Sequence, residues 1–294
     1  MLNKEGRYWV EQMKVKILFI VIFSLIFSSL SIDKLISQRL PQSEWVNGTL
    51  LRADKNSDVY LIYNNQKYQI PNPVTFENLG LSWTKVQVGE VNEIGQLSYG
   101  GFIPHTPPGS IIRERGAYTV FIVCDGQKYA IPNSQTARDL RTDRWNQYVI
   151  TWPKGVIDLI PKGNDISTSS TWKEHRFYGG YCTWYVSLKR KIPWGGNAKE
   201  WLANAKSAGF FIGNNPVLGS IMVTSESDFG HVALVELVIW DREGKWQTFQ
   251  VSEMNWGFIR DKEMGKTVNF NKVTTRYFTK KKPPNPKTLL GFIY

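Results

Sequence analysis

Four residues in the last third of the chain have side chains suited to nucleophilic chemistry: Cys182, His231, Glu253 and Asn255. A cysteine thiolate is a nucleophile, an imidazole can move the proton, and a carboxylate or amide can orient the imidazole or polarise a carbonyl oxygen. The chain has 2 cysteines and 3 histidines, so few other residues could do this chemistry. The same scarcity excludes a disulfide scaffold and a closed cysteine-rich zinc site.

The sequence around Cys182 predicts a helix that begins at this residue. Gly179-Gly180 forms a turn, and the apolar-periodic stretch that follows ends at Lys189-Arg190-Lys191. A helix N-terminus stabilises a thiolate, which a nucleophile needs and a buried structural cysteine does not. A second helix is expected over residues 198–208, with Asn197 as its cap and Glu200 three residues later.

Strands are expected after these two helices, which makes this region an α+β arrangement. They are Ser220–Thr224, His231–Trp240, Trp246–Asn255 and about Val273–Phe278. His231 opens the longest strand, and alternation along the next strand places Glu253 and Asn255 on one face and Met254 on the other. A lone histidine is usually structural, but a cysteine at a helix start upstream and this polar pair downstream favour a functional role.

Four motifs, in this order along the chain, resemble the cysteine, histidine-dependent amidohydrolase/peptidase (CHAP) domain over about residues 174–279. They are Gly180-Tyr181-Cys182-Thr183-Trp184-Tyr185-Val186, Pro216-Val217-Leu218-Gly219-Ser220-Ile221-Met222, Gly230-His231-Val232-Ala233-Leu234-Val235-Glu236 and Ser252-Glu253-Met254-Asn255. The resemblance implies a papain-like fold with N-terminal helices and an antiparallel sheet. It also implies hydrolysis of peptidoglycan, either at the muramoyl–alanine amide or at a peptide bond of the stem or cross-bridge.

The resemblance implies a role for each candidate. Cys182 would be the nucleophile, His231 the general base and then the general acid, and Glu253 the residue that orients the imidazole. Asn255 would be a fourth site residue, either orienting or polarising, and the backbone N–H of Cys182 could bind an oxyanion. We expect no cofactor and no metal, because the segment Trp172–Tyr181, where some related domains hold calcium, contains only one acidic residue.

The N-terminal residues 1–32 are expected to be a signal peptide or a membrane anchor. Four basic residues precede an apolar run from Ile17 to Leu30, which is short for a bilayer core of about 30 Å. Ser29 and Ser31 favour cleavage near residue 32, whereas Tyr8 and Trp9 in a long N-terminal region favour a retained anchor. A buried helix of a soluble protein would normally show a polar face, which this run lacks. Either export interpretation places the rest of the chain outside the cytoplasm.

Residues 47–163 contain two tandem repeats, at about 47–101 and 109–163. The segment 66–72 returns as 127–133 with six identities in seven positions, Gln-Lys-Tyr-x-Ile-Pro-Asn. Each repeat is expected to form a strand, a tight turn, a second strand and a short helix, a ββα unit. The repeats contain no shared carboxylate pair, metal cluster or phosphate loop, so we interpret them as binding or spacer modules.

A polar linker at 164–171 precedes the CHAP-like domain at 172–279, and a basic, proline-rich tail is expected at 280–294. The net charge of +11 favours anionic wall polymers as additional partners of a peptidoglycan-binding protein. No interleaved basic and aromatic motif indicates nucleic-acid binding. Contact with a membrane is expected only through residues 1–32.

Other cysteine, histidine and acidic residues are expected to be structural. Cys124 ends an apolar strand and corresponds to Tyr63 in the first repeat, so we expect a core residue and no disulfide with Cys182. His105 lies in a proline-rich loop, His175 at the surface, and Glu236 on the face of its strand opposite to His231. The alternative to an enzyme is a wall-binding or assembly protein that uses the repeats and a catalytically idle CHAP-like module.

Overall fold

The computed structural model describes residues 45–294, and the expected signal or anchor segment at residues 1–32 lies outside this range. Within the described range the chain is rich in β-strands, and its α-helices have six to eight residues. Hydrogen bonds organise the strands into a five-stranded, a four-stranded and a six-stranded sheet and one two-stranded ribbon. None of the helices in residues 45–294 is long and apolar enough to cross a membrane.

The first sheet has the strand order β4-β1-β2-β3-β5. Its three central strands are antiparallel, whereas β4 and β5 add to the two sides in parallel orientation. Its elements are β1 (Leu50–Ala53), β2 (Val59–Tyr63), β3 (Gln66–Gln69), α2 (Pro73–Asn78), η1 (Trp83–Lys85), β4 (Val86–Gly89), α3 (Val91–Gln96) and β5 (Ser98–Phe102).

The second sheet has the order β8-β7-β6-β9, and its elements follow the same succession along the chain as those of the first. They are β6 (Ser110–Glu114), β7 (Val120–Cys124), β8 (Gln127–Ala130), α4 (Ser134–Arg141), η2 (Trp145–Tyr148), β9 (Val149–Trp152) and η3 (Val156–Leu159). β9 pairs in parallel with β6, as β4 pairs with β1 in the first sheet.

Both units are larger than the ββα unit expected from the sequence. Each contains the strand, turn, strand and helix, but a further strand precedes them and a parallel strand follows the helix. The helix starts follow the sequence: Asn72 accepts a hydrogen bond from the backbone N–H of Thr75, and Asn133 accepts one from that of Thr136. A two-stranded hairpin with one helix has little apolar area to bury, and the additional strands enlarge the core.

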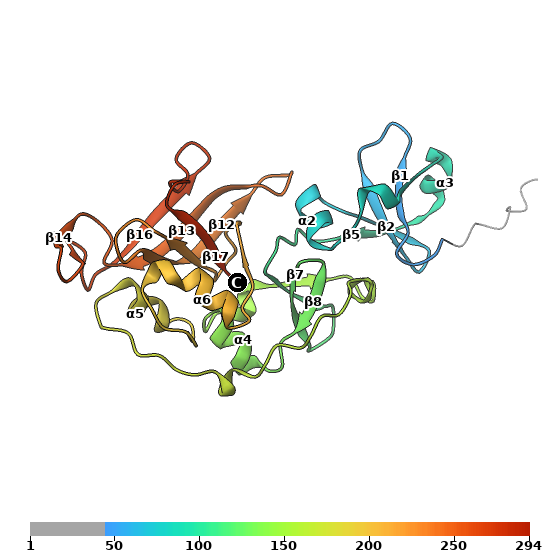
Figure 1. Cartoon of the computed structure of the whole chain (residues 1–294). Helices are drawn as coiled ribbons and strands as arrows, with labels where there is room; N and C mark the ends of the chain where they lie inside the picture. Colours follow the sequence, from blue (N-terminus) through green and yellow to red (C-terminus); the bar gives the residue numbers. More distant parts are fainter. Residues whose placement is uncertain (1–44) are drawn as a thin grey trace, which may run out of the picture. The chain divides into compact units, whose positions relative to one another are not determined.

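The six-stranded sheet has the order β10-β17-β11-β12-β13-β16 and carries the candidate site. Figure 1 shows α5 and α6 beside this sheet. Its elements are α5 (Cys182–Ser187), η5 (Ala198–Glu200), α6 (Trp201–Ser207), β10 (Ile212–Gly213), β11 (Ile221–Thr224), β12 (His231–Trp240), β13 (Trp246–Met254), β16 (Val273–Thr279) and β17 (Leu289–Ile293), with the ribbon β14 (Ile259–Asp261) and β15 (Lys266–Thr267).

Two apolar clusters cover the two faces of the six-stranded sheet. On one face, Ile221 and Val223 of β11 pack with residues of α5 and α6, including the fully buried Trp201. On the other face, Met222 packs with Phe249 and, from β7 of the second repeat, Cys124. Alternation along β11 thus divides the strand between two cores. Cys124 is 1% exposed, which confirms the prediction of a core residue.

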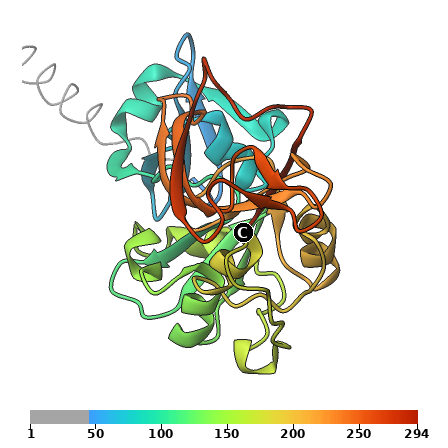
Figure 2. The same cartoon turned by 90° about the vertical axis from the view of Figure 1, so that its left-hand side faces the viewer.

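The expected basic tail at 280–294 is not a tail over its whole length. Residues 289–293 form β17, which lies between β10 and β11 inside the sheet. Figure 1 labels β17, the dark red segment near the chain end, beside β12 and β13, and Figure 2 shows the same part of the chain from the side. Phe292, Ile293 and Tyr294 are at most 1% exposed. A proline-rich segment precedes these residues, so the sequence pattern predicts a tail here. Their short apolar run also lacks the alternation that identifies a strand.

The expected linker at 164–171 is also held to its neighbours. Ser169 is buried, and its backbone N–H donates to the hydroxyl of Thr136 on α4. Its carbonyl accepts a hydrogen bond from Lys191, which follows α5. These contacts join the linker both to the second repeat and to the domain after it.

Candidate active site

The nucleophile candidate Cys182 is the first residue of α5, as the sequence predicts. The helix begins here because Gly180, with φ +88, turns the chain and Tyr181 is extended. The ring of Phe270 lies against Gly180, where a Cβ atom would be 2.5 Å from the ring, so only glycine fits this close approach. Cys182 is 7% exposed and lines a cleft of about 990 Å³.

His231 and Glu253 meet across two neighbouring strands. In the antiparallel pairing of β12 with β13, Leu234 faces Ser252, so His231 and Glu253 are diagonal neighbours on one face of the sheet. Nε2 of His231 lies 2.9 Å from Oε2 of Glu253. His231 is 5% exposed and Glu253 is 0% exposed. Because a carboxylate only accepts hydrogen bonds, Nε2 carries the proton and Nδ1 is left for the thiol.

The electrostatics of Cys182 and His231 favour an ion pair of thiolate and imidazolium. Burial alone would raise the pKa of the Cys182 thiol, but the charge of His231 and the hydrogen bond to it lower that pKa below its ordinary value. Burial would lower the pKa of His231. The Cys182 thiolate and the hydrogen bonds to Cys182 and Glu253 raise it instead, to about 9. A cysteine charged in this way is nucleophilic near neutral pH.

Arg276, which the sequence reasoning did not single out, is the second cation beside Glu253. Its Nη2 donates to Oε2 of Glu253 at 2.8 Å, and its Nε lies 2.7 Å from Oε1. In the ladder between β13 and β16, Arg276 faces Val251, which places it on the same face as Glu253. Only the strand register could have identified this residue, because an arginine within an expected strand has no distinguishing pattern.

Asn255 lies in the site but does not contact the imidazole. Its side chain donates to the carbonyl of Gly265 at 2.9 Å and accepts from the backbone N–H of Thr267 at 2.8 Å. β13 ends at Met254, and Asn255 has φ +59, so the alternation that would have aligned it with Glu253 stops one residue earlier. The structure therefore brings Cys182, His231 and Glu253 together and uses Asn255 to hold the loop around β14 and β15.

The cleft above Cys182 has aromatic and apolar walls with a few charged groups. His231 and Asn255 line it together with Cys182. Other lining residues are Arg176, Phe177, Tyr178, Tyr181, Glu226, Asp228, Phe229, Trp256, Ile259, Lys262 and Met264. Tyr178 is 87% exposed and Phe229 is 45% exposed, so part of this apolar wall faces solvent. Exposed aromatic rings beside a reactive group are suited to stacking on a ligand.

The remaining expected structural residues lie as follows. Glu236 accepts hydrogen bonds from Ser252 and from Arg144 of the second repeat, which agrees with a structural role. His105 is partly buried, next to Asn72 and Trp240. His175 is not a simple surface residue, because it is partly buried and borders the cleft.

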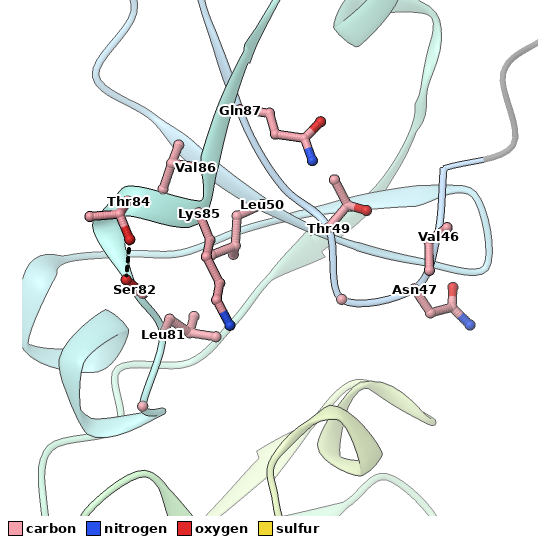
Figure 3. Close-up of a pocket in the computed structure, with 12 residues that line it drawn as sticks. Val46, Asn47, Thr49, Leu50, Leu81, Ser82, Thr84, Lys85, Val86 and Gln87 are labelled. Carbon is pink, nitrogen blue, oxygen red and sulfur yellow. Dashed lines mark hydrogen bonds between the residues drawn. The ribbon is translucent and has the colours of Figure 1, made fainter.

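A second hollow, of about 620 Å³, lies on the first repeat (Figure 3). It is lined by the residues that lead into β1 and by the turn between α2 and β4, where Ser82 and Thr84 share a 2.8 Å hydrogen bond. The equivalent place in the second repeat is filled: Gly109, 61 positions after Gly48, packs against the ring of Tyr294. The two repeats therefore differ in whether this face is covered.

Comparison with known proteins confirms the resemblance for the C-terminal part of the chain. Residues 171–255 match the family model described as the CHAP domain. The chain is similar to staphylococcal secretory antigen ssaA2 from Staphylococcus aureus strain MRSA252, with 39% identity over 106 residues, 34% of this chain and 37% of that protein. It is also similar to the "Probable autolysin SsaALP" of Staphylococcus aureus strain NCTC 8325 / PS 47, with 33% identity over 110 residues, 35% of this chain and 40% of that protein.

The alignments thus span two fifths or less of the length of these relatives. Among solved structures, an N-acetylmuramoyl-L-alanine amidase from Staphylococcus aureus matches with 17% identity and a TM-score of 0.28. This match covers 47% of this chain and 39% of that one.

Proposed function

We propose that the protein is an exported cysteine hydrolase that cleaves an amide bond of peptidoglycan. The observation that carries the proposal is the arrangement of Cys182 and His231 along an aromatic-lined cleft, with Glu253 hydrogen-bonded to His231. A buried cysteine whose pKa is lowered by a neighbouring imidazolium is the arrangement that an acyl-transfer nucleophile needs. The bond cleaved is either the muramoyl–alanine amide or a peptide bond in the stem or cross-bridge.

The first half of the reaction forms a thioester. The Cys182 thiolate attacks the carbonyl carbon of the scissile amide, and the carbonyl oxygen takes up the negative charge. The backbone N–H of Cys182 has no partner within its own helix, because it lies in the first turn, and it can donate to this oxygen. The imidazolium of His231 then gives its Nδ1 proton to the leaving nitrogen, the C–N bond breaks, and the amine departs.

The second half releases the acid. Neutral His231 accepts a proton from a water molecule, the resulting hydroxide attacks the thioester carbonyl, and the C–S bond breaks. The Cys182 thiolate returns and the imidazolium is restored beside it. Throughout both halves, Glu253 holds Nε2–H, so Nδ1 keeps facing the reacting atoms.

The names of the relatives support this substrate and location. One is called a secretory antigen and another a probable autolysin. A signal peptide or anchor at residues 1–32 would serve the same location. For the two repeats we propose a binding or spacer role at the wall, to which the net charge of +11 would contribute by attraction to anionic wall polymers.

The test is digestion of purified peptidoglycan, with mass spectrometry of the released fragments. The full chain is compared with Cys182→Ala and with Cys124→Ala, the matched control for the other cysteine. We expect release by the wild type and by Cys124→Ala, and none by Cys182→Ala. Intact free stem peptides indicate an amidase, whereas severed stems or bridges indicate an endopeptidase.

The alternative is a wall-binding protein with a catalytically idle CHAP-like domain. The same digestion experiment distinguishes it from the hydrolase. If the wild type sediments with several types of peptidoglycan but releases no fragment from any of them, the hydrolase proposal is wrong. The binding function would then lie with the repeats or with the cleft as a ligand site.

A further inference from the structure

The carboxylate of Glu253 is buried between two cations. It is 0% exposed, its Oε2 accepts from both His231 and Arg276, and its Oε1 lies 2.7 Å from Nε of Arg276. A carboxylate that leaves water at this depth needs opposite charge or hydrogen bonds to stay ionised. His231 by itself is an incomplete partner, because the ring loses its positive charge when its Nδ1 proton is transferred in the proposed reaction.

Arg276 is itself fixed from several sides. Its guanidinium lies 4.1 Å from the ring centre of Trp256 and 5.1 Å from that of Phe278. It also lies 3.3 Å from Glu226, and the side chain is only 12% exposed. A guanidinium takes no part in the proton transfers of the proposed reaction, so this cation does not change during catalysis.

The strand register places these side chains in one row. Glu253 is on β13, the strand between β12 and β16, and His231 and Arg276 are its diagonal neighbours on the two sides. Both residues therefore reach Oε2 of the carboxylate from the two flanking strands, and Arg276 contacts Oε1 as well. Arg276 does not line the cleft, but its partners Trp256 and Glu226 do.

We propose that Arg276 is a positioning residue that holds the Glu253 carboxylate in place, so that Glu253 can orient His231 toward Cys182. This inference deepens the proposed hydrolase function. Its effect on hydrolysis rests on that function, whereas its effect on the reactivity of the Cys182 thiol does not. Arg276 also contacts Trp256 and Glu226, which line the cleft, so the same side chain contacts both the Glu253 carboxylate and the cleft wall.

The charged and titratable groups around Glu253 determine what the loss of Arg276 does. His231 of β12 and Arg276 of β16 face the carboxylate directly, Cys182 of α5 lies beyond His231, and Glu226 lies beyond Arg276. Without the guanidinium, Glu253 loses one of the two donors to its Oε2 and the contact at its Oε1, so its hydrogen bond to His231 is no longer held in place. A displaced Glu253 supports the imidazolium less, and the Cys182 thiolate in turn loses its partner.

The experiment measures the rate of Cys182 alkylation by iodoacetamide between pH 4 and 9, together with peptidoglycan hydrolysis over the same range. The variants are Arg276→Gln and Arg276→Lys, and the matched control is the exposed Arg242→Gln on the same domain. For Arg276→Gln we expect the acid limb of both profiles to move up by about one pH unit or more. Arg276→Lys keeps the charge but not the two-point contact, so its limb should lie between those of Arg276→Gln and the wild type.

An acid limb that stays in place in Arg276→Gln while the melting temperature falls would mean that Arg276 only supports the fold, and would overturn the proposal. If Arg276→Gln does not fold, the shift in Arg276→Lys decides, and an unshifted limb there overturns the proposal as well. Alkylation keeps the two proposals distinguishable. A shifted alkylation limb with no hydrolysis by the wild type supports the role of Arg276 and rejects the hydrolase.

Discussion

Nε2 of His231 lies 2.9 Å from Oε2 of Glu253, and this contact determines which ring nitrogen can act on Cys182. The carboxylate holds the proton on Nε2, so Nδ1 is the atom that exchanges a proton with the thiol. The two strands that carry these residues are neighbours in the sheet, whereas Cys182 begins α5, which packs with Val232 and Met254, the chain neighbours of His231 and Glu253. The site thus joins one rigid sheet to the start of one helix.

The two cysteines should differ in reactivity at mildly acidic pH. Burial raises the pKa of Cys124 to about 12, whereas the pKa of Cys182 is lowered by His231. At pH 6 we expect iodoacetamide to modify Cys182 at least about ten times faster than free cysteine, and Cys124 not at all. Mass spectrometry of peptides after timed quenching measures both rates. Equal modification of the two cysteines would contradict the ion pair.

Hydrolysis should decline at high pH because His231 loses its proton. The pKa of His231 is raised to about 9, so the imidazolium that protonates the leaving nitrogen is present below that pH and is lost as the pH rises through it. We therefore expect kcat/KM on soluble peptidoglycan fragments to fall above pH 9. A rate that falls already near pH 6.5, the ordinary pKa of histidine, would show that the two partners do not raise it.

Asn255 should act through the loop that it holds. Asn255→Ala removes two hydrogen bonds and places a Cβ-bearing alanine at φ +59, whereas Asn255→Gly removes the same bonds without backbone strain. We expect both variants to raise KM, because the loop lines the cleft, and Asn255→Ala to be less stable than Asn255→Gly by about 1 kcal/mol. Urea unfolding and hydrolysis kinetics measure the two effects. A drop in kcat alone would instead favour direct action of the amide on the reacting atoms.

The paired glycines of the two repeats allow a matched stability test. A Cβ at Gly109 would lie 2.3 Å from the ring of Tyr294, whereas at Gly48 the nearest atom is 3.9 Å away. Both glycines have positive φ, +83 and +92, so the backbone strain is common to the two substitutions. We expect Gly109→Ala to lower the free energy of unfolding by about 2 kcal/mol more than Gly48→Ala. Similar losses in urea melts would show that Tyr294 moves aside at little cost.

His105 should make the fold sensitive to acid. Burial lowers its pKa to about 4 from 6.5, although Asp241 opposes this. The group binds a proton more weakly in the folded state, so its contribution to stability is complete above pH 6.5 and declines as the pH falls toward 4. Because the ring is partly exposed, we expect a loss of about 1–2 kcal/mol over that range. Urea melts at pH 6.5 and 4.5 should show a smaller loss in His105→Gln, and an equal loss would assign the acid sensitivity to other groups.

Local sequence determined the elements whose signals lie within a few neighbouring residues. The caps at Asn72 and Asn133 are formed, and Asn197 and Glu200 form the expected capping box. The strands that carry His231 and Glu253 lie where alternation places them, and the motifs around Cys182 led to a family resemblance that the CHAP match confirms. These features depend on backbone geometry and side-chain spacing over about one turn or one strand.

Only the tertiary structure decided the features that depend on pairing between distant segments. Arg276 became part of the site through the register of β16 against β13, β17 entered the sheet between β10 and β11, and Asn255 turned toward the loop of β14 and β15. In each case the partner lies elsewhere in the chain, and alternative registers would have satisfied the same local pattern. A shift of one residue reverses which side chains share a face, and it is burial of the apolar cores on both faces of the sheet that selects one register.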